Sequence, residues 1–258
     1  KTNPLKPYYV NSIKLLMNKI KYITLCFAAL LSCSEDNDDV LQTLATYTQG
    51  RVFEMGAVIA CAASDKDTGE VLAFYYLESQ ASDIRFYETN NAQVDENDFT
   101  NYTRNSICEE PFFNGYLGKF TQSADHEKWI IITFELDGEI KMSNPIRLKQ
   151  ISKPTVWNDD VTINQSQSGM PNFMWEDNPF GDNAIYFQVV SDESDNLLSG
   201  TYTYENQFQY YNTNNVVLNV TNKTPPNLVL SENYNFTVMD VSLDNWVNWV
   251  IEKPFIAE

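Results

Sequence analysis

The chain has 258 residues, of which 43% are hydrophobic and 14% aromatic, and this composition excludes a fully disordered protein. It carries 17 Lys and Arg against 35 Asp and Glu, a formal net charge of −18. Because such a charge repels phosphate backbones and anionic lipid head groups, the composition argues against a nucleic-acid partner. The length predicts one or two domains.

The N-terminal part has the layout of a secretory signal. Residues 17–21 are cationic, and a ten-residue apolar run, 22–31, leads to Ser32-Cys33. The run has about half of the ~20 residues that a membrane-spanning helix needs. The alternative is a buried core helix, which the cationic flank disfavours. Leu30-Leu31-Ser32-Cys33 resembles the lipobox of bacterial lipoproteins, which implies that residues 1–32, an upstream extension plus signal peptide, are removed and that Cys33 carries the lipid.

An acidic run, residues 34–39, follows Cys33 directly. It resembles the surface-export signal of Bacteroidetes lipoproteins, which implies a protein that is lipid-anchored in the outer membrane and displayed at the cell surface. The alternative is a solvated tether, 33–49, that only spaces the folded part from the membrane.

Four cysteines are present, and two of them belong to the N-terminal segment. Cys61 and Cys108 remain in a chain that is expected in an oxidising compartment, where disulfides persist. We therefore expect a bridge between them, which would stabilise the fold by roughly 3–4 kcal/mol. The alternative is a pair of buried free thiols that act as small apolar side chains.

Beyond residue 49 the chain alternates short β-branched and aromatic runs with Asn, Asp, Gly and Pro clusters, which predicts strands and turns. In residues 50–150 the expected strands are 57–62, 71–78, 84–88, 112–120, 129–136 and 140–148. Residues 129–136 show period-2 alternation most clearly. Asp137-Gly138 follows as a favoured hairpin turn.

The pattern resets at Ser152-Lys153-Pro154, since proline cannot continue a central strand. Residues 153–258 then show further strands near 173–175, 185–190, 200–204, 208–211, 216–220, 234–238 and 246–251. Two blocks of about 100 residues, 50–150 and 153–258, each have the size of one immunoglobulin-like sandwich. The expected fold class is all-β, with two tandem β-sandwiches after a signal peptide.

The second block resembles a fibronectin type III domain. Such domains carry a Trp on the second strand followed by a Pro-containing turn, as Trp175 and Pro179 are placed here. They also place a Leu six residues before the Tyr of a tyrosine corner, and Leu228 and Tyr234 have this spacing. The resemblance implies an immunoglobulin-like β-sandwich for residues 153–258.

No residue pattern indicates catalysis, a metal or a cofactor. His126 is the only histidine and lies in a polar turn, so a Ser-His-Asp triad and a His-rich zinc site lack their residues. Residues 65–70 look faintly like a calcium loop, but Gly69 stands at the fifth position where an EF-hand has it at the sixth, which favours a polar hairpin turn. Weak calcium binding between carboxylate-rich loops remains the alternative.

Aromatic residues give the sharpest functional indication. Tyr202, Tyr204, Tyr210 and Trp246 are the candidate ligand-binding residues, because exposed aromatic rings stack against sugars. Trp246 and Trp249 fall on opposite faces of the last strand, from which we expect that at least one is exposed. The alternative is ordinary packing, since Tyr and Trp favour strands.

The sequence therefore predicts a non-enzymatic surface lipoprotein without a cofactor, which binds an extracellular glycan or an envelope protein. The alternatives are a structural or adhesive spacer of the cell envelope and an accessory domain of a hydrolase.

Overall fold

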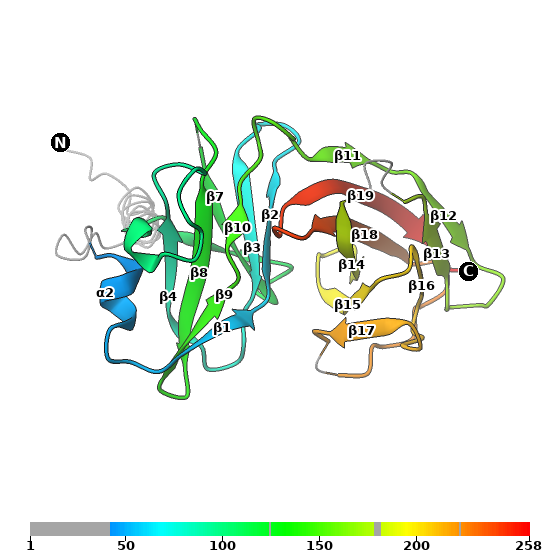
Figure 1. The fold of residues 1–258 in the computed structure, drawn as a ribbon. Helices are drawn as coiled ribbons and strands as arrows, with labels where there is room; N and C mark the ends of the chain where they lie inside the picture. The colour runs from blue at the N-terminus through cyan, green and yellow to red at the C-terminus, as the bar shows by residue number, and fades with distance from the viewer. Residues whose placement is uncertain (1–41, 124, 178–181, 222) are drawn as a thin grey trace, which may run out of the picture. The chain divides into compact units, whose positions relative to one another are not determined.

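The structure is a computed structural model that describes residues 42–123, 125–177, 182–221 and 223–258 (Figure 1). Almost all regular structure in these ranges is β-strand, which confirms the all-β fold class. The signal segment 1–32, the lipidation residue Cys33 and Pro179 lie outside the described residues.

Two sheets draw all their strands from the first half of the chain (Figure 1). Sheet A has the order β1-β9-β8-β4-β5, with β10 paired to β8, and sheet B has the order β2-β3-β7-β6. The bounds in sheet A are β1 (Phe53–Val58), β4 (Ser82–Glu88), β5 (Thr103–Asn105), β8 (Trp129–Leu136), β9 (Glu139–Ser143) and β10 (Ile146–Arg147). Those in sheet B are β2 (Ala60–Ser64), β3 (Val71–Tyr76), β6 (Glu109–Phe112) and β7 (Leu117–Gln122).

The second half forms two further sheets. Sheet C has the order β11-β19-β18-β14-β15-β17, and sheet D has the order β12-β13-β16. The bounds in sheet C are β11 (Val156–Asn158), β14 (Asn183–Asp192), β15 (Leu197–Thr203), β17 (Val216–Asn219), β18 (Asn233–Ser242) and β19 (Val247–Ile256). Those in sheet D are β12 (Val161–Asn164), β13 (Asn172–Trp175) and β16 (Gln207–Gln209).

Both halves repeat one strand topology. In immunoglobulin-like sandwiches strands A, B, E and D form one sheet, and C, F and G form the other. In the first half, strands A, B, E and D correspond to β2, β3, β7 and β6, and strands C, F and G correspond to β4, β8 and β9. In the second half, A, B and E correspond to β12, β13 and β16, and C, F and G correspond to β14, β18 and β19, so this half follows the scheme without strand D among the described strands. In each half the first strand also pairs in parallel with the strand in the G position, β1 with β9 and β11 with β19. The chain therefore contains two tandem immunoglobulin-like sandwiches.

Local sequence signals explain several connections. Asp137 and Gly138 have φ values of +53° and +80°, so the predicted hairpin turn joins β8 and β9 with the two positive φ angles of a type I′ turn. The expected strand 112–120 is divided into β6 and β7, because Phe113, Asn114 and Gly115 all take positive φ and reverse the chain. Two other expected strands, 57–62 and 140–148, are likewise divided in two.

The tyrosine corner expected in the second half is present. Tyr234 is the second residue of β18, and its hydroxyl accepts a hydrogen bond from the backbone N–H of Val229 at 2.9 Å. Leu228 and Trp175 are buried in the same cluster, between sheets C and D. At Trp175, Leu228 and Tyr234 the structure therefore agrees with the resemblance to a fibronectin type III domain.

The four sheets are stacked through three hydrophobic clusters. One cluster lies between sheets A and B, one between sheets B and C, and one between sheets C and D. Residues 71–75 of β3 are all buried, as a strand covered on both faces requires. Sheets B and C thus each pack against another sheet on both faces, and the cluster between them joins the two sandwiches. Independent folding of residues 50–150 and 153–258 stays a prediction.

A short helix, α2 (Leu44–Thr48), and the 3₁₀ turn η1 (Phe99–Asn101) cover the outer face of sheet A. Leu44 and Tyr47 are buried there, and the guanidinium groups of Arg51 and Arg85 both lie over the Tyr47 ring, 4.8 and 4.0 Å from its centroid. Folded structure therefore begins within the segment expected to be a tether. No helix in the described ranges is long and apolar enough to cross a membrane.

Candidate functional site

Cys61 and Cys108 do not form the disulfide expected from the sequence. Cys61 is a free, buried cysteine in β2, whereas Cys108 is exposed and directly precedes β6. Strands β2 and β6 are the opposite edges of sheet B, so a spacing of ~4.8 Å per strand separates them by roughly 14 Å. A disulfide needs Cα atoms within about 7 Å. The predicted Cys61–Cys108 bridge is therefore wrong.

The four aromatic candidates do not form one surface. Tyr210 and Trp246 are 2% and 0% exposed and belong to hydrophobic clusters. Tyr202 is half-buried and stacks on Phe187, with ring centroids 4.5 Å apart. Only Tyr204 is freely exposed, at 68%. A shared stacking platform of these four residues is absent, and Tyr204 alone among them is open to a ligand.

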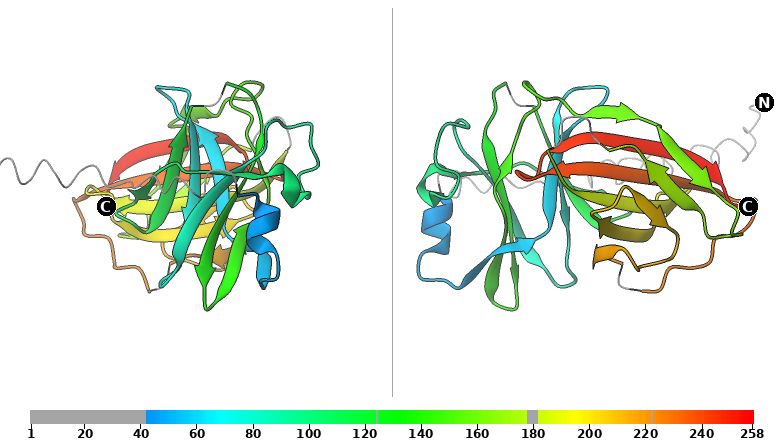
Figure 2. Two further views of the ribbon diagram at one scale, coloured as in Figure 1. Left: turned by 90° about the vertical axis from the view of Figure 1, so that its left-hand side faces the viewer. Right: turned by 45° about the vertical axis from the view of Figure 1, so that its right-hand side comes forward.

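Trp246 is buried because it crosses from one sandwich into the other. It belongs to the β18–β19 hairpin of the second half, which reaches toward β2 in Figures 1 and 2, but its side chain lies in the cluster between sheets A and B. It forms a bridge with Ala62, and its indole N–H donates to the Lys153 carbonyl at 2.8 Å. Trp249 lies in the cluster between sheets C and D. The two tryptophans lie in different cores and both are buried, so the expectation of one exposed Trp is wrong.

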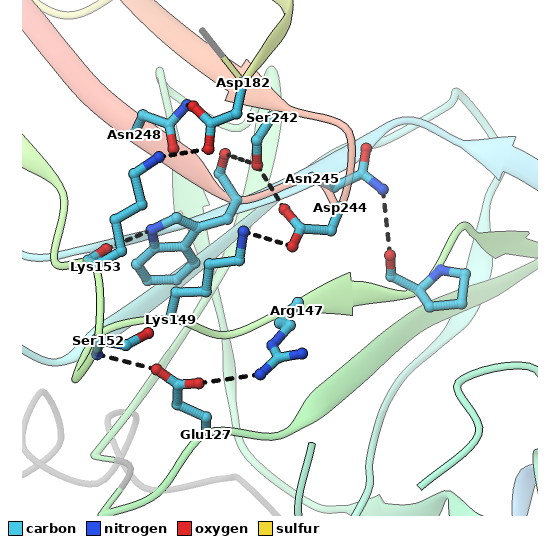
Figure 3. A network of polar contacts seen from close by, with 12 residues as sticks. Glu127, Arg147, Lys149, Ser152, Lys153, Asp182, Ser242, Asp244, Asn245 and Asn248 are labelled. Atoms are coloured by element: carbon cyan, nitrogen blue, oxygen red, sulfur yellow. Dashed lines mark hydrogen bonds and ion pairs between the residues drawn. The ribbon is translucent and has the colours of Figure 1, made fainter. Parts of the chain in front are cut away.

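The turn that carries Trp246 also makes polar contacts, through Asp244 and Asn245 (Figure 3). The Asp244 carboxylate pairs with Lys149 at 2.5 Å, and the Asp244 carbonyl accepts from the Arg147 backbone N–H at 3.0 Å. The Asn245 amide donates to the Pro145 carbonyl at 3.2 Å. These contacts join the β18–β19 turn of the second sandwich to the segment around β10 of the first.

A groove opens on the face of sheet C that packs against sheet B, at the point where this packing ends. Along β18, Met239 and Val241 belong to the cluster between sheets B and C, while Asn235 and Thr237 occupy the same face closer to the strand start and line the groove. Pairing places Asn235 between Ser191 of β14 and Pro254 of β19. This junction groove has a volume of about 540 Å³ and takes its floor from three neighbouring strands.

The wall of the junction groove comes from the first sandwich. Phe112 and Phe113 lie at the β6–β7 turn, with ring centroids 4.4 Å apart. The amide of Asn114 in the same turn donates to the Ser194 carbonyl and to Asn196 Oδ1, both at 2.8 Å. The turn is therefore fixed to the β14–β15 turn of the second sandwich, and the groove exists only where both sandwiches meet.

Polar side chains in the junction groove are held in part by contacts outside it. Glu252 pairs with Lys66 at 3.1 Å, and this hydrogen bond raises the pKa of Lys66. The ammonium group of Lys253 donates to the Asp159 carbonyl at 3.1 Å. Within the described part of the chain, the side chains of Asn235 and Thr237 make no hydrogen bond. The groove thus offers an amide and a hydroxyl that a ligand can engage.

Sequence reasoning did not find this groove, although the strands carry a signal for it. In β14, β18 and β19 apolar residues occur on both faces, as in Ile185-Tyr186-Phe187 and Val247–Ile251. A strand apolar on both faces is buried on both. The change to polar Asn235 and Thr237 on the outer face then marks where the cover ends.

The remaining motifs have structural roles. Asp65 accepts hydrogen bonds from the backbone N–H groups of Asp67 and Thr68, at 2.9 and 2.8 Å, so residues 65–70 form a polar turn between β2 and β3. His126 lies exposed beside Asp125. In the part of the chain that the structure describes, no group of three or more His, Cys, Asp or Glu side chains is placed to hold a metal ion.

No protein-family model matches the chain, and no curated protein matches it. Among solved structures it matches the chicken interferon gamma receptor alpha chain (TM-score 0.23, 10% identity, 78% of this chain and 97% of that chain). It also matches the chicken CNTN1 FN1–FN3 domains (0.28, 10%, 80% and 68%) and the Clostridium thermocellum CbhA fibronectin(III)-like modules (0.22, 11%, 81% and 92%). At this level of similarity these structures say nothing about what this chain binds.

Proposed function

We propose that the chain is a non-enzymatic lipoprotein of the cell surface that binds an extracellular glycan in the junction groove. The observation that carries the proposal is the groove itself, a cavity of about 540 Å³ that both sandwiches build. Its volume lies within the roughly 300–1,000 Å³ typical of ligand sites. Anchoring through Cys33 in the outer membrane is supported by the lipobox-like sequence and the acidic run after it.

The lining supports a neutral, hydroxyl-rich ligand. Asn235, Thr237 and Glu252 supply donors and acceptors from adjacent strands, and Phe112 supplies apolar surface beside them. Sugars present both hydroxyl groups and apolar C–H faces, so they match a site that combines aromatic surface with a few converging polar groups. The glycan is thus expected in the junction groove, away from the buried Tyr210 and Trp246.

A spacer of the cell envelope is the second candidate function, and the joint between the sandwiches favours it. Apolar side chains of sheets B and C form one cluster there, and Thr155 and Ser64 exchange hydrogen bonds of 2.7 and 2.8 Å across it. A joint of this kind fixes the orientation of two sandwiches, which is the property that a spacer requires.

Glycan-array screening of the purified chain, with Cys33→Ala to keep it lipid-free, distinguishes the two. Binding should fall at least about tenfold in the double variant Asn235→Ala/Glu252→Gln, while stability changes by less than about 0.5 kcal/mol because both side chains reach the surface. Tyr204→Ala is the control, since Tyr204 is exposed outside the groove. If no glycan binds, or if only the control loses binding, the junction groove is not the glycan site.

A further inference from the structure

A second cavity lies on the opposite side of sheet C from the junction groove, at its β11 edge. It has a volume of about 300 Å³, and its apolar lining comes from Val156 of β11 and from Trp249 and Ile251 of β19. Val156 is 58% exposed, so this edge pocket opens to solvent. A volume at the lower end of the roughly 300–1,000 Å³ of ligand sites suits one side chain better than a whole small molecule.

Carboxylates surround this apolar surface. Asp160 and Glu176 are exposed and line the edge pocket, and Asp177 lies beside them. The Tyr186 hydroxyl donates a hydrogen bond to the Asp177 carboxylate. Burial is the main cause that raises the pKa of Tyr186, and the bond to Asp177 is the second. The hydroxyl therefore stays protonated and keeps Asp177 in place. Lys153 also lines the pocket, but its ammonium group pairs with Asp182 at 2.5 Å. Carboxylates therefore outnumber cations among the residues that line the edge pocket.

A buried acceptor without a partner lies in the wall of the edge pocket. Asn248 is 3% exposed, and its side-chain amide donates to Asp182 and Asp240, both at 3.0 Å. Within the described residues its carbonyl oxygen Oδ1 accepts no hydrogen bond. Leaving a buried acceptor unsatisfied costs free energy, so a ligand that donates to Asn248 Oδ1 recovers free energy that the protein alone does not.

An indole ring supplies the third element. The Trp249 ring packs against the Tyr186 ring, with centroids 5.9 Å apart. The Tyr186 ring in turn packs against the Trp175 ring, with centroids 5.3 Å apart. Trp is the best aromatic partner for a cation, because its π face carries negative potential. The pocket thus combines an indole ring, carboxylates and an unsatisfied carbonyl oxygen. This combination is complementary to a side chain that carries a positively charged hydrogen-bond donor at the end of an aliphatic stem.

We propose that the edge pocket binds the side chain of a Lys or Arg residue presented by a partner protein. The aliphatic stem lies against Val156 and Ile251, and the cationic group meets the Trp249 ring, the rim carboxylates and Asn248 Oδ1. A free metal ion does not use the apolar half of the pocket, and a neutral sugar does not use the carboxylates. The net charge of −18 attracts a basic partner over long distances. This site is independent of the junction groove.

The test is a nuclear magnetic resonance titration of the ¹⁵N-labelled full chain with the peptide acetyl-Gly-Lys-Gly-amide, repeated with Arg in place of Lys. The amide signals of Val156, Trp249 and Ile251 should shift. The same peptide with Nε-acetyl-lysine, which keeps the stem and removes the charge, should produce no comparable shift.

The double variant Asp160→Asn/Glu176→Gln should weaken binding of the Lys peptide about tenfold, since it removes two rim charges without changing side-chain size. Asp137→Asn/Glu193→Gln is the matched control, with the same change of net charge at exposed positions elsewhere. The proposal is overturned if neither basic peptide shifts these signals, if the acetylated peptide binds equally well, or if the control variant weakens binding as much. Asn235→Ala should leave the titration unchanged, because Asn235 lines the junction groove and not the edge pocket. The two proposals can therefore fail independently of each other.

Discussion

Replacing Trp246 tests whether the two sandwiches depend on each other. Trp246 is 0% exposed, and aromatic side chains of this kind bury about 150–250 Å². At ~25 cal/mol per Å² this area corresponds to roughly 4–6 kcal/mol, and measured Trp-to-Ala changes in cores cost about 3–5 kcal/mol. We expect Trp246→Ala to lower the free energy of unfolding by about 4 kcal/mol, a large part of the 5–15 kcal/mol typical of a domain.

Urea unfolding followed by circular dichroism measures this loss, and amide hydrogen exchange locates it. Protection should fall in the first sandwich, at β2 and β10, although the substitution is in the second. Leu243→Ala is the matched control, because Leu243 lies in the same turn but is 87% exposed, so its cost should stay within about 0.5 kcal/mol. A cost for Trp246→Ala below about 1 kcal/mol, or a loss of protection confined to the second sandwich, would refute the coupling.

Four further predictions follow from single features. Cys33→Ala should remove the protein from the membrane fraction and abolish incorporation of labelled palmitate; a variant that still takes up the label contradicts lipidation at Cys33. Burial raises the pKa of Cys61 to about 12, so iodoacetamide at pH 8 should modify Cys61 only after denaturation and without reductant, whereas a need for reductant would indicate a disulfide. Tyr210→Ala should cost about 3–5 kcal/mol in urea unfolding, and Tyr204→Ala less than about 0.5. The fragment 153–258 should fold by circular dichroism but self-associate in sedimentation experiments, since it exposes the apolar outer face of sheet C; a stable monomer would mean that this face needs no cover.

The secondary structure could be predicted where it depends on neighbouring residues. The alternation in β8, the positive φ angles of Asp137 and Gly138, and the bond from Val229 to Tyr234 are set by sequence-local chemistry. Strand ends were less accurate, as at 112–120, because the turn at Phe113 contains aromatic residues that are typical of strands.

The candidate sites were predicted poorly because burial depends on distant parts of the chain. Trp246 and Trp249 do point in different directions, but the inference of exposure assumed that only one face of the last strand meets protein. Each enters a different core, one in each sandwich. The Cys61–Cys108 pairing failed for a similar reason, since sequence separation does not reveal that β2 and β6 are opposite edges of one sheet.

The position of the junction groove follows from the pattern of a single strand. On the outer face of β18, Met239 and Val241 need a cover because together with their neighbours they form an apolar surface, and the first sandwich provides it. Asn235 and Thr237 are polar and need no apolar cover, so the groove begins beside them although Thr237 is only 7% exposed, and the Phe112 turn closes its side. Apolar residues at positions 235 and 237 would favour packing of the first sandwich over them, and this packing would fill the groove. The polar residues at these two positions therefore separate the joint from the cavity.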